Sequence, residues 1–426
     1  MPAVLAASVS TRPSRLDVSL NGKLVGHLDD FGVATYTFAY IPGLGAQDRL
    51  SASLPLQEQR FLAHQTKPFF EGLLPEERVR TSVANQLGID FADSFGLLAA
   101  IGGECACAVT LTPHGQPPEP VGGITWLDDD ELSERIENLP SFPLGRDERT
   151  RSRASLAGAR RKLVAVVDGS RVGIPDGTLP TTHLLKPQWR SGPDDPQIHD
   201  IVANEAFCMR VAKRAGCDVA NVEPRMVGQR PVLFVERFDR YRGQDGTVLR
   251  RHQEDMGQAA GQLPSSKYEE DGGMNLAKVA DTAAMAGIAR IVAVRALLDA
   301  IVVAAVVGNA DQHAKNLGIL YRSPAVLAPL YDITSTLIYD LPQRSAFVVG
   351  GELYIDAIGT DACVTAAEAF GMPVGQARSR VDDLTRRLHD AVPVALDEAQ
   401  REGWHTPTVD QIAELITTWP NRTVGK

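Results

Sequence analysis

An apolar run that ends in a compact group of polar residues is the feature that most constrains this chain. Residues 291–307 are rich in Ala, Val, Ile and Leu and are interrupted by charge only at Arg295 and Asp299. Charges are costly at the centre of a bilayer, so this run predicts a buried helix rather than a membrane span. Gly308 follows it, residues 309–316 are mostly polar, and the apolar residues 317–320 favour a strand. The fold must therefore bury a helix that leads directly into a polar loop.

Two acids and an amide stand out in and after this loop. Asp311 and Asn316 lie five positions apart, and Asp332 follows within a Leu-Tyr-Asp-Ile segment. In phosphoryl transfer, one carboxylate takes or orients the hydroxyl proton, while an amide oxygen and a second carboxylate hold Mg²⁺ on the nucleotide phosphates. The pattern predicts a kinase-type catalytic loop, with Asp311 as the base and with Asn316 and Asp332 as metal ligands.

Two further residues of the loop leave alternatives open. His313 follows Asp311 closely, as in a metal hydrolase with Asp and His ligands, but no second His-containing cluster accompanies it. We expect His313 to shape the loop by packing or hydrogen bonding. Lys315 is expected to neutralise the transferring phosphate, and a solvated lysine is the alternative. Acyl transfer is unsupported, because the chain has no G-x-S-x-G nucleophile motif.

Segments before this loop match other parts of a kinase nucleotide site. Residues 182–187 predict a strand that carries Lys186 and ends at a proline. Glu205, on a predicted helix, is placed to pair with Lys186 and fix its ammonium against nucleotide phosphates. A solvated edge lysine is the ordinary alternative. Residues 231–240 fit an interlobe hinge in which Phe238 meets adenine, although the segment alone favours an edge strand.

A basic loop precedes these strands. Residues 146–161 are rich in arginine and lead into Ser155, Ala157, Gly158 and Ala159. A Ser/Gly/Ala stretch beside a strand lets backbone N–H groups approach phosphate oxygens. The alternative is a flexible basic loop. The segment has one glycine in this stretch and matches neither common glycine-rich fingerprint, so it does not by itself predict a phosphate site.

The domain organisation is predicted from changes in pattern along the 426 residues. Asn21-Gly22 between two alternating runs predicts a β-hairpin. We expect a small α+β unit over residues 1–145, a phosphate-loop and hinge unit over 146–240, and a helical lobe over 241–426. The net charge of −10 argues against direct nucleic-acid binding. Five cysteines without a metal-ligand framework, and no convincing signal peptide, favour a reducing cytoplasm.

Taken in order, nine blocks of the chain resemble the HipA toxin kinases of type II toxin–antitoxin modules. The resemblance covers nearly the whole chain, and the order of the blocks makes it specific. The blocks are residues 51–56, 69–76, 155–162, 182–187, 235–240, 253–256, 263–269, 309–316 and 329–333.

The resemblance implies an ATP- and Mg²⁺-dependent serine/threonine protein kinase. It implies an α+β, two-lobed, protein-kinase-like fold with an extra N-terminal α+β subdomain and an all-helical C-terminal lobe. Asp311 would be the base, and Asn316 and Asp332 the magnesium ligands. The implied ATP-binding residues are Lys186, Glu236, Phe238, Ala157, Gly158 and Ala159.

Regulation and partners are implied in the same way. Ser155 matches a serine that these kinases autophosphorylate to switch themselves off. Arg160 and Arg161 depart from the Gln-Glu pair common in the family, so this loop differs from the family pattern at these two positions. The expected partners are a HipB-like DNA-binding antitoxin and a protein substrate such as an aminoacyl-tRNA synthetase, with no membrane. A kinase without a toxin role and a non-catalytic scaffold that binds nucleotide and antitoxin remain alternatives.

Overall fold

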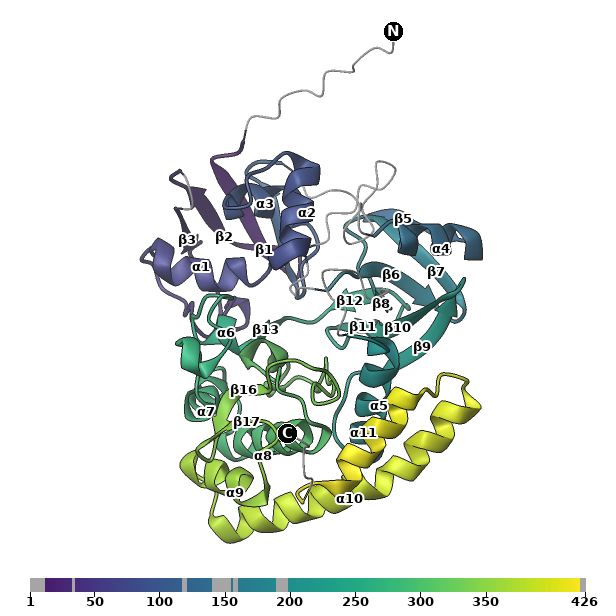
Figure 1. Ribbon diagram of the computed structural model, residues 1–426. Coiled ribbons are helices and arrows are strands. Elements are labelled where there is room, and N and C mark those ends of the chain that lie inside the picture. The colour runs from purple at the N-terminus through teal and green to yellow at the C-terminus, as the bar shows by residue number, and fades with distance from the viewer. Residues whose placement is uncertain are drawn as a thin grey trace.

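The computed structural model describes residues 12–32, 35–116, 121–139, 155, 160–188 and 198–421. Within these residues the chain forms three units, which follow one another along the sequence and are coloured in that order in Figure 1. The first is purple to blue, the second teal, and the third green to yellow. This arrangement is the expected α+β fold, with an extra N-terminal unit beside a sheet-containing lobe and a helical lobe.

A four-stranded antiparallel sheet with the order β3-β2-β1-β4 forms the first unit. Its strands are β1 (Arg15–Leu20), β2 (Lys23–Asp30), β3 (Tyr36–Tyr40) and β4 (Val109–Pro113). Helices α1 (Ala63–Glu71), α2 (Glu77–Leu87) and α3 (Ser94–Ile101) and a short 3₁₀ turn (Ala46–Asp48) complete it. The predicted hairpin is confirmed: Asn21 and Gly22 join β1 to β2 with φ angles of 50° and 78°.

Period-two alternation places the core of this unit on one face of the sheet. Leu16, Val18 and Leu20 of β1 are buried, whereas the residues between them are partly exposed. The helices add Phe69 and Phe70 to the same hydrophobic cluster. The opposite face of β1 is thus free to carry polar side chains.

The second unit is a six-stranded antiparallel sheet with the order β5-β7-β6-β8-β10-β9. The strands are β5 (Val121–Leu127), β6 (Leu163–Asp168), β7 (Arg171–Gly177), β8 (His183–Pro187), β9 (Val222–Val227) and β10 (Arg230–Glu236). Helices α4 (Asp129–Glu137) and α5 (Ile201–Arg214) accompany it. Alternation along β10 serves two cores, because Val232 and Phe234 pack with α4 while Leu233 and Val235 pack with α5.

The expected boundary after residue 145 is corrected by this sheet. Strand β5 pairs with β7, and Leu132 and Ile136 of α4 pack against residues of β6 and β8. The segment 121–137 therefore belongs to the second unit. Its local pattern of strand and acidic helix does not reveal which sheet it joins, because that depends on pairing with strands about 50 residues later.

The third unit is helical apart from small sheets. Its helices are α6 (Met256–Ala259), α7 (Leu276–Met285), α8 (Arg290–Val307), α9 (Thr360–Ala369), α10 (Val374–Arg401) and α11 (Pro407–Thr418), with 3₁₀ turns at Glu269–Asp271 and Ala314–Asn316. A hairpin of β11 (Arg240–Arg242) and β12 (Val248–Arg250) leads into it. Its two small sheets join β13 (Gln253–Asp255), β14 (Gly318–Leu320) and β15 (Val326–Leu327), and β16 (Arg344–Val349) and β17 (Glu352–Tyr354).

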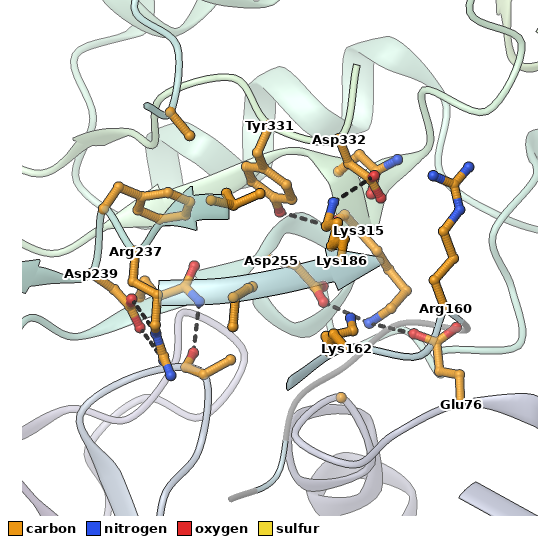
Figure 2. A pocket seen from close by; sticks show the side chains of 18 of the residues that line it. Glu76, Arg160, Lys162, Lys186, Arg237, Asp239, Asp255, Lys315, Tyr331 and Asp332 are labelled. Carbon is orange, nitrogen blue, oxygen red and sulfur yellow. Dashed lines mark hydrogen bonds and ion pairs between the residues drawn. The ribbon is translucent and has the colours of Figure 1, made fainter. Parts of the chain in front are cut away.

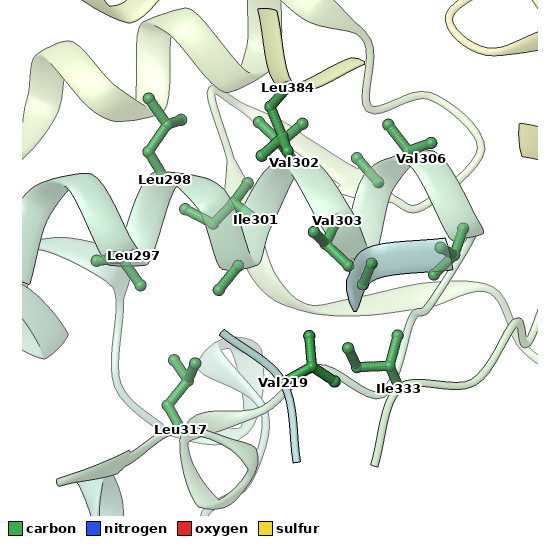
Figure 3. Close-up of a cluster of buried hydrophobic side chains, with 14 of the residues drawn as sticks. Val219, Leu297, Leu298, Ile301, Val302, Val303, Val306, Leu317, Ile333 and Leu384 are labelled. Atoms are coloured by element: carbon green, nitrogen blue, oxygen red, sulfur yellow. The ribbon is translucent and has the colours of Figure 1, made fainter. Parts of the chain in front are cut away.

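Helix α8 is the centre of the helical lobe. Figure 3 shows its apolar side chains extending on several sides, with Leu384 above and Val219, Leu317 and Ile333 below. A helix that is apolar all round is stable only when it is buried in this way. Its three charges are accommodated, since Arg290 and Arg295 are exposed and Asp299 pairs with Arg380. In the described part of the chain, no helix is both long and apolar enough to cross a membrane.

The polar loop begins where α8 ends. Gly308 has a φ of 74°, and a Cβ atom there would lie 2.5 Å from the Leu337 side chain. Its N–H donates to the carbonyl oxygens of the last helical turn, which ends the helix in a left-handed cap. The chain then turns back through residues 309–316 and enters β14.

Candidate active site

A cleft with a volume of about 240 Å³ lies where the three units meet. The residues that line it include Glu76 from the first unit, Lys186 and Phe238 from or just after the second, and Asp311, Asn316 and Asp332 from the third. Residues about 250 positions apart thus face one space. The cleft contains both strongly basic and strongly acidic groups, with Lys186 and Asp332 joined across it (Figure 2).

Strand β8 presents Lys186 to two carboxylates. Its Nζ donates to Glu205 Oε1 at 2.7 Å and to Asp332 Oδ1 at 3.0 Å. The predicted pairing of Lys186 with Glu205 is confirmed, and Glu205 on α5 is only 2% exposed. Burial lowers the pKa of Lys186, but Asp332 and Glu205 outweigh this and raise it overall. Lys186 is therefore a fixed cation rather than a solvated edge residue.

Asp332 lies in a loop that is anchored to the second unit. The neighbouring Leu330 exchanges backbone hydrogen bonds with the segment after α5, and Asp332 itself has a φ of 56°. Positive φ is uncommon for a residue with a side chain and marks a position held by its surroundings. Although burial raises the pKa of Asp332, Lys186 and Arg160 outweigh it and hold that pKa well below its usual range. The carboxylate is thus ionised at neutral pH.

The loop after α8 orients Asp311 and Asn316 relative to each other. Asn316 Nδ2 donates to the backbone carbonyl of Asp311 at 2.9 Å. The backbone N–H of Asp311 donates to Asn309 Oδ1 at 3.0 Å. The Asp311 carboxylate accepts a hydrogen bond of 2.8 Å from the Tyr268 hydroxyl and stays half-exposed. This leaves a carboxylate oxygen of Asp311 open to the cleft.

The oxygen donors of the cleft fit a Mg²⁺ ion. Because Asn316 Nδ2 is engaged by Asp311, Oδ1 is the atom of that amide left for a cation. Asp332 lines the same cleft and is ionised and 36% exposed at its side chain. Carboxylate and amide oxygens with room for water and phosphate oxygens are the ligands that Mg²⁺ prefers.

The side chains of His313 and Lys315 both lie near carboxylates of the protein. His313 Nε2 is 3.7 Å from Asp311 Oδ1, and its Nδ1 is buried without a hydrogen-bond partner among the described residues. Lys315 Nζ lies 2.7 Å from Asp255 and 3.6 Å from Glu76. Burial lowers the pKa of Lys315, and the two carboxylates raise it above the usual range. Lys315 therefore ties the loop to the first unit and to the end of β13, where Asp255 caps α6.

An apolar part of the cleft adjoins the second unit. Phe238 and Tyr331 pack with ring centroids 5.5 Å apart and line the cleft, as do Leu184 and Val235. The predicted Glu236 also lines it, and its carboxylate accepts from Asn221 Nδ2 at 2.8 Å. Flat aromatic rings beside aliphatic side chains suit a planar heteroaromatic base.

Ser155 is fully buried against the first unit. Its hydroxyl donates to the backbone carbonyl of Leu73 at 2.6 Å, and its N–H donates to the carbonyl of Glu104 at 2.6 Å. In this conformation the hydroxyl is engaged by protein. The predicted phosphate-loop residues Ala157, Gly158 and Ala159 lie outside the described residues.

Several residues that line the cleft were not predicted from the sequence to belong to the site. Arg160 lies 3.7 Å from Glu205, and Lys162 is buried close to Lys186. Burial, together with Lys186, lowers the pKa of Lys162 to about 8. The basic run 160–162 just before a strand was a visible signal for both. The carboxylates that pair with Lys315, and Tyr268 beside Asp311, gave no local signal.

Family models and individual relatives match most of this chain. A family model described as the HipA-like C-terminal domain matches residues 154–392, and one described as the HipA N-terminal domain matches residues 16–112. The protein Y4mE of Sinorhizobium fredii is 37% identical over 393 residues, covering 90% of this chain and 92% of that protein. The serine/threonine-protein kinase toxin HipA of Shewanella oneidensis is 29% identical over 396 residues, covering 88% of each.

A solved structure matches over nearly the same extent. It is the complex of HipA, HipB and operator DNA from Shewanella oneidensis, and its matching chain superposes with a TM-score of 0.78 at 27% identity. The match covers 95% of this chain and 96% of that chain.

Proposed function

Because the chain belongs to the HipA family, we propose that it is a protein kinase that transfers the terminal phosphate of ATP to a serine or threonine hydroxyl. The observation that carries the proposal is the convergence of Lys186, Asp311, Asn316 and Asp332 on one cleft. These four come from strand β8 and from two loops of the helical lobe. Their residue types supply a phosphate-binding cation, a base and two metal-binding oxygens.

The basic groups of the cleft would bind the phosphates. Lys186 is held by Glu205 and Asp332, and Arg160 and Lys162 line the same cleft. Cations fixed before the nucleotide arrives stabilise the transferring phosphoryl group without a further cost of reorganisation. The adenine ring would lie against Phe238 and Tyr331, whose rings are already packed together.

Asp311 would act on the incoming hydroxyl. Its carboxylate is half-exposed, ordered by Tyr268 and by the backbone of its own loop, and so is able to accept the proton as the hydroxyl attacks. Asn316 and Asp332 would hold the metal, and Mg²⁺, when bound, neutralises charge on the nucleotide phosphates. Lys315 is assigned to positioning rather than to phosphate contact, since Asp255 and Glu76 occupy its ammonium.

Ser155 is the proposed site of autophosphorylation. Its buried hydroxyl must leave the Leu73 carbonyl to reach a phosphate donor. A phosphate carries roughly two negative charges at neutral pH. Such a group does not fit the fully buried position beside Glu104, itself a buried carboxylate with a lowered pKa. Phosphorylation would therefore keep this segment out of its present place.

The biological role is proposed from the relatives. The matching HipA was solved with HipB and operator DNA, and we propose a HipB-like antitoxin as the partner of this chain. A translation protein such as an aminoacyl-tRNA synthetase is the proposed substrate, and the cytoplasm the proposed compartment. The alternatives are a kinase without a toxin role and a scaffold that binds nucleotide without turnover.

Transfer of radiolabelled phosphate from ATP separates these possibilities. We expect the purified chain with Mg²⁺ to label itself, with phosphate on Ser155 by mass spectrometry, and to label a protein in a cell extract. Excess EDTA should abolish labelling. Nucleotide binding without labelling in any extract would support the scaffold instead.

The toxin role needs a separate measurement. Expression of the chain should arrest growth, and co-expression of a small DNA-binding protein encoded beside it should relieve the arrest. Phosphoproteomics of cells expressing the wild type against an Asp311→Asn variant would identify the substrate. Labelling activity without growth arrest would favour a kinase with a different role.

A further inference from the structure

Three potential metal ligands meet on the outer face of the first sheet, away from the cleft. Asp17 lies in β1, directly opposite His27 of β2 in the strand register. His114 follows the last residue of β4, the strand on the other side of β1. Alternation along β1 buries Leu16 and Val18 and turns Asp17 to the opposite, solvent-facing side. Strands β1 and β2 and the residue directly after β4 therefore present one side chain each to a single point.

The ligand atoms already converge there. Asp17 Oδ1 lies 2.8 Å from His27 Nδ1 and 2.7 Å from His114 Nδ1, and the two imidazole rings meet edge to face with centroids 5.3 Å apart. The other carboxylate oxygen, Oδ2, accepts the Gly115 N–H at 3.3 Å. The backbone N–H of His114 donates to the Arg15 carbonyl at 3.0 Å. Backbone hydrogen bonds thus hold Asp17 and His114 in place at this edge of the group.

Hydrogen bonds alone account for these distances if each Nδ1 carries a proton. Two features favour a metal. The group is a complete set of two imidazole nitrogens and one carboxylate oxygen, the donors that suit first-row divalent ions. It is also reachable from solvent, because the Asp17, His27 and His114 side chains are 17%, 23% and 51% exposed.

The spacing requires only a small adjustment. Ligand atoms about 2.0–2.1 Å from a tetrahedral ion lie about 3.3 Å from one another. The two separations from Asp17 Oδ1 are shorter by about half an ångström, and all three ligand atoms lie within 4.8 Å of one another. The exposed His114 ring has room to turn outward. Gly115 would continue to hold Asp17 Oδ2, as partners of metal-binding carboxylates commonly do.

We propose that Asp17, His27 and His114 bind one divalent transition-metal ion, with a zinc-type coordination completed by water. The ion would join the end of β4 to β1 and β2, where the chain leaves the first unit toward β5. This site does not depend on the proposed kinase activity. Its role is to hold together the unit whose Glu76 and Leu73 line the cleft.

Calorimetric titration of the full chain, after treatment with a chelator, tests the proposal with ZnCl₂. We expect one equivalent to bind, and Co²⁺ to give the visible absorption of a nitrogen- and oxygen-coordinated tetrahedral site. Even outer-shell partners contribute about 10–100-fold to metal affinity, so His27→Gln or His114→Gln should weaken binding at least that much. Zn²⁺ should raise the Tm of the wild type and leave that of the variants unchanged.

His64→Gln is the matched control, because His64 is an exposed histidine of the same unit. It should bind Zn²⁺ as the wild type does, and circular dichroism should show that all variants fold. Absence of binding by the wild type would mean a hydrogen-bonded triad only, and would overturn the proposal. Equal Zn²⁺ affinity in the His27 and His114 variants would place the bound ion elsewhere and also overturn it.

Discussion

The ammonium of Lys186 lies 3.0 Å from a carboxylate oxygen of Asp332, although the two residues are 146 positions apart. One comes from a strand of the second unit and the other from a loop of the helical lobe. Their contact brings the proposed phosphate-binding cation and one of the proposed metal ligands to the same place. It also ties the two lobes together across the cleft, so substitutions here are expected to affect stability as well as activity.

Removal of one partner should show this coupling. In Lys186→Met the nearly inaccessible Glu205 loses its closest cation. Breaking a buried pair costs about 3 kcal/mol, at the low end here because Arg160 also faces Glu205. Urea denaturation should report this loss, and the double variant Lys186→Met/Glu205→Gln should recover part of it. A double variant less stable than Lys186→Met would contradict the assignment.

Asp311→Asn should abolish most phosphoryl transfer while nucleotide binding persists. The amide keeps the size of the side chain but cannot accept the hydroxyl proton, which contributes about 10²–10⁴-fold to rate. Transfer of labelled phosphate to substrate measures the first property and fluorescent-nucleotide titration the second. Asp356→Asn, at an exposed aspartate outside the cleft, is the control. Similar kcat values in the two variants would remove Asp311 from its assigned role.

Nucleotide affinity should depend on pH through Lys162. Burial, with Lys186, lowers its pKa to about 8, so the ammonium is present below that pH and is lost as pH rises through it. We expect the Kd for ATP to rise several-fold from neutral to alkaline pH. In Lys162→Arg the charge persists, because arginine stays protonated, and the pH dependence should flatten. An identical pH profile in both proteins would exclude Lys162.

The same shift predicts a trend in stability. The pKa of Lys162 is lower in the folded chain than in the unfolded chain, so between about pH 8 and pH 10.5 the unfolded chain binds more protons at this position. The contribution of Lys162 to the free energy of unfolding should therefore increase as pH rises through this window. Denaturation of wild type and Lys162→Met at several pH values isolates that contribution.

Tyr268→Phe should reduce catalysis less than Asp311→Asn does. The hydroxyl of Tyr268 donates to the Asp311 carboxylate at 2.8 Å, and its removal leaves a half-exposed carboxylate free to turn. We expect kcat to fall about tenfold, comparable to one hydrogen bond to a charged group, with little change in the KM for ATP. A higher kcat in Tyr268→Phe would mean that Tyr268 blocks the base rather than positioning it.

Local patterns predicted those parts of the molecule that depend on neighbours in the chain. The turn at Asn21 and Gly22 formed because these residues tolerate positive φ between two alternating strands. Helix α8 formed because its residues are apolar on every side, and it ended where Gly308 permits the left-handed cap. The polar loop that carries Asp311 and Asn316 follows directly from that ending.

Tertiary structure alone decided which of these segments meet. No periodicity indicates that Glu76 of the first unit pairs with Lys315, that Tyr268 donates to Asp311, or that β5 joins the second sheet. The same holds for Asp17, His27 and His114, which come together through the register of three strands. Secondary structure reflects spacing within a few residues, whereas these contacts arise from burying one surface against another, and no short stretch of sequence contains both surfaces.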